Sequence, residues 1–284
     1  MADLSMATVM SLSGRVGLVT GGGTGIGFII AKAFAANGAK VYIAGRRLDV
    51  LEKAAASVTG VPGSIVPLRM DVTDEEHVKA GVKHIEGTDG KLDVLVNNAG
   101  FASPVRDPDF VAKRSVATDP FELETIQNWT DIFALNTIAP FFVVRAFQSL
   151  LVKGAHSRPQ GTSSIINIGS ALAKLNTTPH MMGYGATKAA LEKLTLVLGT
   201  SFAQRGVPIR VNVLSPGAFA NELTSAEFIE TIKTKPPPGF VAPVPARRLG
   251  TDAEMAMAAI YLAVSDYTNG AISDLDGGLS LVNP

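Results

Sequence analysis

Short apolar runs alternate along the chain with longer segments in which apolar residues recur at helical spacing. The apolar runs are rich in valine, isoleucine and leucine and have the length of buried strands; they lie at residues 16–20, 40–44, 65–70, 93–97, 164–168, 209–214 and 271–274. The helical segments lie at residues 26–37, 48–57, 74–86, 125–152, 183–205 and 252–265. Strands that are regularly followed by helices are typical of parallel strands joined by crossovers. The pattern predicts an α/β fold with a doubly wound, seven-stranded parallel sheet and helices on both faces.

No linker or break in composition divides this pattern. We therefore predict a single domain over residues 14–284, preceded by an N-terminal extension at residues 1–13. Two segments stand outside the pattern: a polar insertion at residues 101–124, and residues 219–249, which include Lys235-Pro-Pro-Pro-Gly239. Ligands of a doubly wound sheet bind at the carboxyl ends of the strands, where such loops gather. We assign residues 219–249 to a substrate-binding loop.

The composition excludes several classes of protein. The chain has 284 residues, 46% of them hydrophobic, with 25 basic and 25 acidic residues. This balance creates no net field for nucleic acid or for an anionic membrane, so we expect neither as a partner. The sequence has no cysteine, which excludes disulfides, a thiol nucleophile and a zinc–thiolate site. The histidines lack the spacing of metal ligands, and we predict no metal site.

Two segments of the chain bear on the location of the protein. Residues 1–13 lack the basic start and continuous apolar run of a signal peptide, so a cytoplasmic location is expected. The most apolar run, residues 132–152, is interrupted by Asn136, Pro140, Arg145 and Gln148. These interruptions predict a buried helix rather than a membrane span.

A glycine-rich turn follows the first predicted strand and leads into the first predicted helix. Its spacing is Gly21-x-x-x-Gly25-x-Gly27, which differs from the usual G-x-G-x-x-G fingerprint. Glycines at such a turn let backbone N–H groups approach a pyrophosphate, and the helix N-terminus adds positive partial charge. A tight strand-to-helix connection is the alternative, but the place of the turn in the pattern favours a Rossmann-type dinucleotide site.

The second predicted strand ends at a position that distinguishes NAD from NADP. A carboxylate there accepts the ribose 2′-hydroxyl of NAD and repels a 2′-phosphate. This chain has Gly45 instead, followed by Arg46 and Arg47. The guanidinium fork of arginine fits a phosphate. We therefore predict NADP(H) as the cofactor; a solvated helix start is the alternative, and it applies more to Arg47 than to Arg46.

Tyr184 and Lys188 are four residues apart in a helical segment, so they share one helix face. A tyrosine pKa lowered from about 10 to about 7 corresponds to about 4 kcal/mol. A unit charge about 4 Å away supplies about that much at an effective dielectric constant of about 20. Lys188 alone is therefore expected to make Tyr184 active in proton transfer near neutral pH, with Ser170 bonded to the same substrate oxygen. For this spacing alone, an ordinary surface pair is the alternative.

Taken together, these motifs resemble the short-chain dehydrogenase/reductase family from about residue 12 to the end of the chain. The matching motifs are residues 20–27, Asp71-Val72, Asn97-Asn98-Ala99-Gly100, Asn136, Ser170, Tyr184, Lys188, Pro216-Gly217 and Asp276-Gly277-Gly278. The chain departs from the family in a longer insertion at residues 101–124 and in one additional residue between Ser170 and Tyr184. Thr187 stands where serine is commoner, a change that we expect to be neutral.

The resemblance implies an oxidoreductase in which hydride passes between C4 of a nicotinamide and a carbonyl carbon. Tyr184 is then the general acid or base, and Lys188 lowers its pKa and binds the nicotinamide ribose. Ser170 holds the substrate oxygen, and Asn136 supports Lys188 through a water. The implied cofactor-binding residues are Gly21, Thr24, Gly25, Ile26, Gly27, Arg46, Arg47, Asp71, Val72, Asn98, Ala99, Gly100, Tyr184, Lys188, Pro216, Gly217 and Ala218.

The candidate walls of the substrate pocket are mostly apolar: Phe101, Val105, Ala171, Leu172, Leu175, Met181, Met182, Phe219, Phe228 and Phe240. Each of them has core filling as its alternative role. Such walls favour an apolar ketone over a sugar, and His180 is expected to be a loop residue rather than a base. The resemblance is closest to 3-oxoacyl reductases and secondary-metabolite carbonyl reductases, so we predict NADPH-dependent reduction of a ketone to a secondary alcohol.

Two other functions stay open. One is an NADP-dependent alcohol or polyol dehydrogenase working oxidatively, and the other is a non-catalytic nucleotide-binding scaffold. The family usually forms tetramers, so the resemblance also implies a homotetramer or homodimer. The helices at residues 125–152 and 183–205 would pair across one twofold axis, and residues 279–282 would dock across another.

Overall fold

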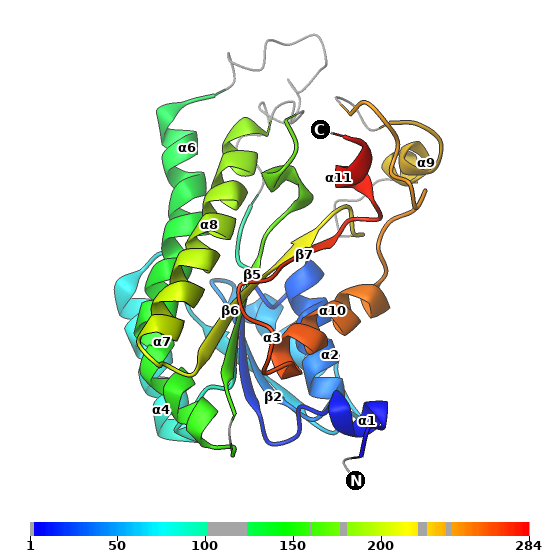
Figure 1. The fold of residues 1–284 in the computed structure, drawn as a ribbon. Helices are drawn as coiled ribbons and strands as arrows, with labels where there is room; N and C mark the ends of the chain where they lie inside the picture. The colour runs from blue at the N-terminus through cyan, green and yellow to red at the C-terminus, as the bar shows by residue number, and fades with distance from the viewer. Residues whose placement is uncertain are drawn as a thin grey trace.

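Seven parallel strands form one sheet, in the order β3-β2-β1-β4-β5-β6-β7 (Figure 1). The strands are β1 Val16–Thr20, β2 Lys40–Gly45, β3 Ser64–Arg69, β4 Val94–Asn97, β5 Ser163–Ile168, β6 Ile209–Pro216 and β7 Ile272–Leu275. This computed structural model describes residues 3–101, 124–159, 161–176, 181–220, 226–236 and 240–283. The predicted doubly wound parallel sheet is confirmed.

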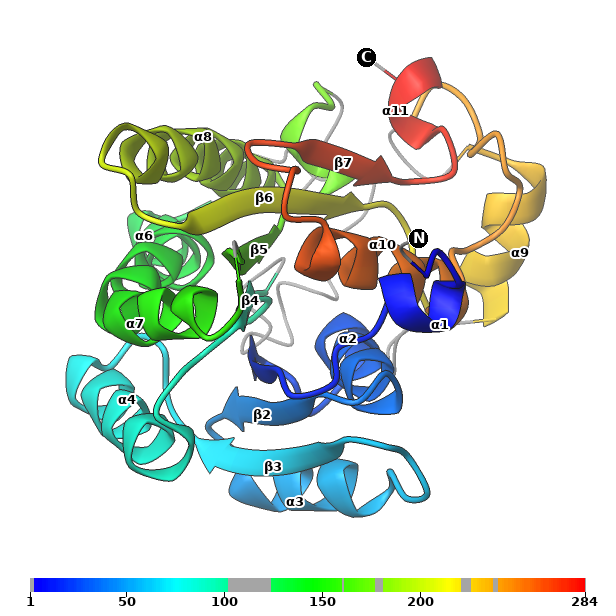
Figure 2. The same ribbon diagram turned by 60° about the horizontal axis from the view of Figure 1, so that its bottom comes forward.

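Helices cover both faces of the sheet (Figure 2). The helices are α1 Met6–Val9, α2 Gly25–Ala36, α3 Leu48–Ala56, α4 Glu75–Asp89, α6 Ile126–Phe133, α7 Ala139–His156, α8 Met182–Gln204, α9 Ala226–Thr234, α10 Asp252–Val264 and α11 Leu279–Val282. Helices α2, α3 and α10 pack on one face, and α4, α7 and α8 pack on the other. Phe34 fills the first layer, and Phe147 and Phe202 fill the second.

The strand order reverses at β1, which pairs with β2 on one side and with β4 on the other. The turns that follow β1 and β4 therefore meet at one point of the sheet edge. Nδ2 of Asn98 joins them by donating to the carbonyl oxygens of Thr20 and Gly21, at 3.0 and 3.1 Å. In doubly wound sheets a ligand binds at such a point.

The prediction of one continuous helix over residues 125–152 is wrong. A π-helical turn, Ala134–Ile138, separates α6 from α7. Pro140 has no N–H to donate to the carbonyl group of Asn136, four residues earlier, so regular α-helical bonding fails there. π-Helical turns of this kind are frequent at functional sites, and this one carries Asn136.

Three short helices were not predicted: α1, α9 and α11. Helix α9 lies within residues 219–249, which the sequence presents as a loop, and its Ile232 is fully buried. Leu12, within the predicted N-terminal extension, is also fully buried, and its N–H donates to the Asn37 carbonyl at 2.8 Å. Part of each irregular segment is therefore packed onto the domain.

The segment Ile126–His156 has 31 residues and is long and apolar enough to cross a membrane by composition alone. Its Val143, Phe147 and Leu151 are buried in the layer between α4, α8 and the sheet. The segment packs as a core helix of the domain, as predicted for residues 132–152.

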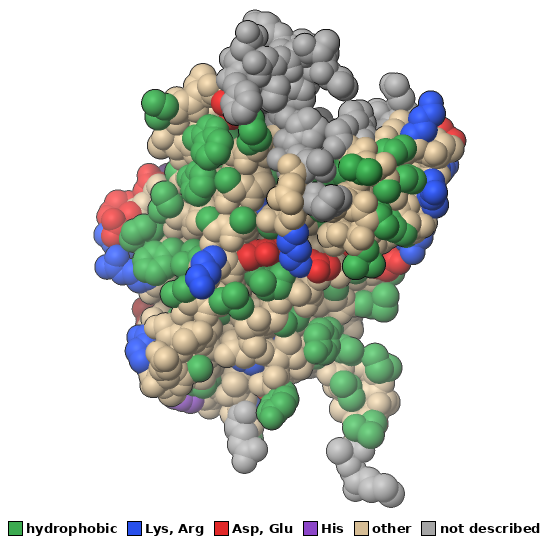
Figure 3. All heavy atoms as spheres, turned by 45° about the horizontal axis from the view of Figure 1, so that its top comes forward, with side chains coloured by type: hydrophobic (Ala, Val, Ile, Leu, Met, Phe, Trp, Pro, Cys, Tyr) green, Lys and Arg blue, Asp and Glu red, His purple; other side chains and the backbone are tan. Residues whose placement is uncertain are grey.

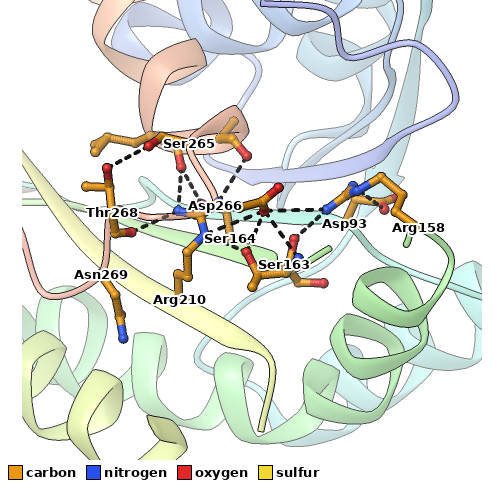
Figure 4. A network of polar contacts seen from close by, with 12 residues as sticks. Asp93, Arg158, Ser163, Ser164, Arg210, Ser265, Asp266, Thr268 and Asn269 are labelled. Carbon is orange, nitrogen blue, oxygen red and sulfur yellow. Dashed lines mark hydrogen bonds and ion pairs between the residues drawn. The ribbon is translucent and has the colours of Figure 1, made fainter. Parts of the chain in front are cut away.

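A buried polar network lies at the amino ends of β4, β5 and β6 (Figure 4). At its centre is Arg210, which is 3% exposed. Its guanidinium donates to three carbonyl oxygens at 3.0, 3.2 and 3.0 Å, those of Leu262, Ala263 and Thr268. Burial lowers the pKa of Arg210 to about 10, so the side chain is still charged at neutral pH. The network ties the last turn of α10 to the first residues of β6.

We expect Arg210→Met to lower the free energy of unfolding by about 3 kcal/mol, because it leaves buried carbonyl groups without their donor. Urea unfolding followed by circular dichroism measures the change. Arg205→Met is the matched control: Arg205 is exposed at the end of α8, so its replacement should change stability by less than about 0.5 kcal/mol. Equal unfolding midpoints for the two variants would contradict the structural role of Arg210.

Candidate active site

Helix α8 brings Tyr184 and Lys188 to the carboxyl end of β5. Tyr184 lies in its first turn, and Lys188, one turn later, is 4% exposed. Nζ of Lys188 donates to the carbonyl oxygen of Ile168, the last residue of β5, at 2.7 Å. The same nitrogen lies 5.6 Å from the centre of the Tyr184 ring. Burial lowers the pKa of Lys188 to about 8.

The pKa of Tyr184 is shifted in the direction opposite to the expected one. Burial raises it, and a hydrogen bond with Ser170 opposes that effect. Nζ of Lys188 lies over the aromatic ring and donates to a backbone carbonyl, and burial dominates the shift of the Tyr184 pKa. The expectation that Lys188 alone lowers the pKa of Tyr184 is wrong.

Ser170 follows the end of β5 and begins a short 3₁₀ turn, Ala171–Ala173. Its Oγ accepts a hydrogen bond from the N–H of Leu172 at 3.2 Å, and its side chain is also hydrogen-bonded to Tyr184. The hydroxyl groups of Ser170 and Tyr184 therefore converge on one point. The additional residue between them in the sequence does not separate the two side chains.

Asn136 connects the π-helical turn to α8. Its Oδ1 accepts from the N–H of Phe101 at 3.1 Å, and its Nδ2 donates to the Phe101 carbonyl at 3.0 Å and to Oγ1 of Thr187 at 3.1 Å. Thr187 is fully buried, and its hydroxyl donates to the Tyr184 carbonyl at 2.7 Å. Threonine keeps the hydroxyl that this contact needs. Sequence reasoning missed Thr187 as a positioning residue, although its place beside Lys188 was a signal.

The glycine-rich turn after β1 is packed closely against the turn after β4. A Cβ at Gly27 would lie 2.3 Å from Nδ2 of Asn98 and 2.5 Å from the carbonyl oxygen of Gly21, so only glycine fits. Thr24 caps α2 in an extended conformation without a side-chain hydrogen bond to the helix. The first N–H groups of α2 are therefore available to an anion.

A cavity of about 650 Å³ lies beside this turn, within the size range of small-molecule and cofactor sites. The predicted cofactor residues that line it are Gly21, Thr24, Arg46, Arg47, Asp71, Val72, Ala99 and Gly100. Phe101, predicted for the substrate pocket, lines it as well. The lining residues that were not among the predicted cofactor residues are Gly23, Ala44, Gly45, Val50, Leu51, Met70, Thr73, Asn128, Asp131, Ala134 and Leu135. Asn128, Asp131 and Leu135 recur at helical spacing, a signal that could have found them.

Arg46 and Asp71 line the cavity just beyond the ends of β2 and β3. Burial would raise the pKa of Asp71, but hydrogen bonds from Thr73 and the charges of Arg46 and His77 together lower it below its usual value. The cavity thus combines free helix N–H groups at one point with an arginine at another. A pyrophosphate and a 2′-phosphate need these two features, so the residues present fit an NADP-type dinucleotide.

The remaining predicted cofactor residues lie in two places. Gly25, Gly27 and Asn98 shape the turn behind the cavity, and Ile26 packs into the core. The others lie at or after the end of β6 and are Pro216, Gly217 and Ala218. The N–H of Gly217 donates to the Leu275 carbonyl at 3.0 Å, which fixes this segment beside β7.

A small apolar cluster lies near the carboxyl ends of β5, β6 and β7. It contains Ala171, Leu175, Ile232, Val244 and Leu279, with Leu172, Ala218, Phe240 and Leu249 packed against it. Of the predicted pocket residues, Ala171 and Leu175 are buried in it, and Phe219 is buried in the main core. Met181 and Met182 are half-buried. Val105, His180 and the side chain of Phe228 lie outside the described residues.

Figure 3 shows this face of the molecule, with apolar side chains at the surface over α6 and around α9. Trp129 on α6 is 36% exposed, and its indole N–H donates to Glu124 at 2.7 Å. This face of the molecule therefore has a buried apolar cluster near the strand ends and exposed apolar side chains on α6.

Comparison with known proteins identifies relatives over almost the whole chain. The family model described as short chain dehydrogenase matches residues 15–230. The short-chain dehydrogenase/reductase VdtF of Byssochlamys spectabilis is 33% identical, over 97% of this chain and 95% of its own. The gluconate 5-dehydrogenase of Gluconobacter oxydans is 32% identical, over 98% of this chain and 99% of its own.

Among solved structures, the RhlG/NADP active-site complex of Pseudomonas aeruginosa superposes with a TM-score of 0.80. It is 28% identical and covers 96% of this chain and 98% of its own. The range matched by the family model includes strands β1 to β6, the residues that line the cavity and the α8 site. The chain belongs to the short-chain dehydrogenase/reductase family and is an oxidoreductase that acts on alcohol or carbonyl groups.

Proposed function

We propose that the chain is an NADPH-dependent ketone reductase that forms secondary alcohols. The observation that carries this proposal is the convergence of Ser170, Tyr184 and Lys188 at the carboxyl end of β5. A cavity of dinucleotide size lies at the neighbouring strand ends. A protein that only binds a nucleotide has no need of these three groups together.

When bound, the nicotinamide supplies a hydride to the carbonyl carbon. Ser170 holds the substrate oxygen by a hydrogen bond, and Tyr184 gives that oxygen its proton. The buried ammonium group of Lys188, held by the Ile168 carbonyl, binds the nicotinamide ribose. Asn136 positions the catalytic helix through Thr187, and its support of Lys188 through a water is part of the same proposal.

NADPH is proposed over NADH because Arg46 follows β2 where a carboxylate would select NAD. Arg46 lines the cavity, so a 2′-phosphate would meet a positive charge there. The structural relative from Pseudomonas aeruginosa is described as a complex with NADP.

The substrate proposed is an apolar ketone of the 3-oxoacyl or secondary-metabolite type. The side chains that approach the strand ends are mainly apolar, including Phe101, Leu172 and Met182, and apolar walls favour such a ligand. The relative from Gluconobacter oxydans acts on gluconate, so oxidation of a polyol or sugar acid is the second candidate.

A substrate panel separates the candidates. Consumption of NADPH is measured with 3-oxoacyl thioesters, aryl ketones, cyclic diketones and keto sugars, and formation of NADPH is measured with gluconate and polyols. The proposal predicts the highest kcat/KM for an apolar ketone. A higher value for a keto sugar or polyol favours the second candidate, and tight NADPH binding without turnover favours a scaffold.

The rate should depend on pH through Lys188. The value of kcat/KM for NADPH reports ionisations of the free enzyme, and the pKa of Lys188 there is about 8. Because that pKa is depressed, the ammonium form and its bonds to the ribose are present below pH 8 and are lost as the pH rises. We expect kcat/KM to be constant at low pH and to fall about tenfold per unit once Lys188 is neutral.

Lys188→Arg is the control for this profile, because arginine stays charged. A variant that retains measurable activity should lack the fall above pH 8. A wild-type profile that is constant up to about pH 10, the value for an ordinary lysine, would contradict the assignment.

A dimer or tetramer is proposed from the exposed apolar side chains of α7 and α8. Phe141, Phe142 and Val197 are 38, 45 and 50% exposed. Apolar side chains grouped on one surface are typical of contacts between subunits. Light scattering should give a mass of two or four chains, and a monomer at micromolar concentration would count against it.

A further inference from the structure

Helix α8 carries a buried carboxylate one turn beyond Lys188. Glu192 is 8% exposed, and its Oε1 accepts a hydrogen bond from Oγ of Ser215 at 2.7 Å. Ser215 is fully buried and is the residue before Pro216, the last residue of β6. Burial raises the pKa of Glu192, and the hydrogen bond from Ser215 opposes that effect. The roles proposed above do not use this carboxylate.

One face of α8 thereby holds the ends of two neighbouring strands. Lys188 donates to the Ile168 carbonyl at the end of β5, and Glu192 accepts from Ser215 at the end of β6. Ser170 follows the first strand end, and Gly217 follows the second. Backbone pairing of β5 with β6 ends at the bond from the Gly169 N–H to the Leu214 carbonyl, at 2.8 Å. Two side chains of one helix then contact the residues just beside this last bond on each strand.

Gly169 fills the space between these two strand ends. A Cβ at this position would lie 2.5 Å from Oγ of Ser215, 2.7 Å from Cγ1 of Val213 and 3.5 Å from Oε1 of Glu192. The turn that leads to Ser170 is thus in direct contact with the bonded pair Glu192 and Ser215. The atoms around Gly169 are closely packed, so a change in the orientation of the Ser215 side chain would displace the turn that leads to Ser170.

The charged groups that face Glu192 form a second pair. Lys174, after the 3₁₀ turn, contacts Asp274 of β7 at 2.5 Å. Lys174 lowers the pKa of Glu192 and Asp274 raises it, so the two charges oppose each other. The hydroxyl of Ser215 is then the specific partner of the carboxylate, and it fixes where the end of β6 lies.

We propose that Glu192 is a positioning residue of the reaction, which acts through Ser215 to hold residues 216–217 against the nicotinamide and in register with Ser170. This inference rests on the proposed function, because it assumes that the nicotinamide lies at these strand ends. It predicts an effect on the nicotinamide half of the cofactor and none on the adenine half, which Arg46 and Asp71 would bind.

Two probes separate the halves of the cofactor: NADPH and adenosine 2′,5′-bisphosphate, both titrated by fluorescence or calorimetry. Glu192→Ala should raise the Kd for NADPH about tenfold, the value of one hydrogen bond to a charged group, and leave the Kd for adenosine 2′,5′-bisphosphate unchanged. Ser215→Ala should give the same result. The double variant should have a Kd for NADPH close to that of either single variant, because Glu192 and Ser215 form one contact.

Glu192→Gln keeps an oxygen that can accept from Ser215, so it should restore most of the NADPH affinity and the kcat of ketone reduction. Thr195→Val is the matched control on α8. It removes a buried hydrogen bond, from Asn167 at 2.8 Å, that touches neither residue 170 nor residues 216–217. It should lower stability and leave the affinities for both probes unchanged.

The outcomes distinguish this inference from the proposed function. Wild-type protein that binds adenosine 2′,5′-bisphosphate but not NADPH would overturn both. Suppose that the wild-type protein binds NADPH. If Glu192→Ala then changes the Kd values of both probes equally, or changes neither, the positioning role alone is overturned. Loss of NADPH affinity in Thr195→Val to the same extent would also overturn it, since the effect would then be one of stability.

Discussion

Tyr184→Phe should lower kcat for ketone reduction by about 10²–10⁴-fold, the usual contribution of a positioned proton donor. The variant keeps the aromatic ring under Nζ of Lys188 and removes only the hydroxyl that is bonded to Ser170. Packing of the first turn of α8 should therefore be preserved. Steady-state consumption of NADPH measures the loss of turnover, and titration with NADPH should give a Kd close to that of the wild type.

Tyr42→Phe is the matched control for this variant. The Tyr42 hydroxyl donates to Asp89 at 2.6 Å, next to Lys40 at the start of β2. This hydroxyl lies at the opposite end of the sheet from Ser170, so its removal should change stability and leave kcat unchanged. If Tyr184→Phe turned over ketones as fast as Tyr42→Phe does, Tyr184 would not be the proton donor.

Arg46→Glu should reverse the preference for NADPH over NADH. The arginine offers charge-assisted hydrogen bonds worth about 1.5–3 kcal/mol to a 2′-phosphate. Glutamate repels that phosphate and accepts a hydrogen bond from the 2′-hydroxyl of NADH. The ratio of kcat/KM for the two cofactors should therefore change by at least about 100-fold. The measurement is a pair of kinetic titrations at saturating ketone.

Arg47→Glu is the comparison for this second prediction. Arg47 also lines the cavity, but it stands one residue further from β2, at the start of α3, so a smaller change in cofactor preference is expected. An Arg46→Glu variant that still prefers NADPH would refute the assignment of the 2′-phosphate site.

The sheet was predictable because its strands are short runs of apolar residues that are buried on both faces. β1 and β5 consist entirely of buried residues, and burial on both faces leaves no helical or alternating pattern to confuse the assignment. The interruption of the helix at Ala134–Ile138 was not predicted, because a π-helical turn differs from an α-helix only in its hydrogen bonds. Pro140 was the one local sign of it.

The site residues that could be predicted are those whose role follows from their residue type and their spacing in the sequence. Tyr184 and Lys188 share a face through their spacing, and the glycines of the turn after β1 are required by close packing on Asn98. Thr187 and Glu192 were missed because each acts through a partner that is distant in the sequence. Thr187 contacts Asn136, and Glu192 contacts Ser215; such contacts follow from strand order and helix rotation, which one sequence does not reveal.

The pKa of Tyr184 could not be derived from spacing for the same reason. A distance of one helical turn allows Lys188 to approach the phenol oxygen, but the Ile168 carbonyl holds its Nζ elsewhere. Burial then determines the direction of the shift. Whether a charge lowers a pKa depends on the position of the charged atom, and the Cα spacing does not fix that position.

Transfer of deuterium from NADPH in which both hydrogens at C4 of the nicotinamide are replaced by deuterium tests the central claim most directly. Wild-type protein is mixed with the labelled cofactor and the best ketone of the panel, and the product is analysed by mass spectrometry. The account predicts a secondary alcohol that carries one deuterium on the former carbonyl carbon, in an amount equal to the cofactor oxidised, and no product with Tyr184→Phe. Unlabelled alcohol, or oxidation of the cofactor without alcohol, would contradict it.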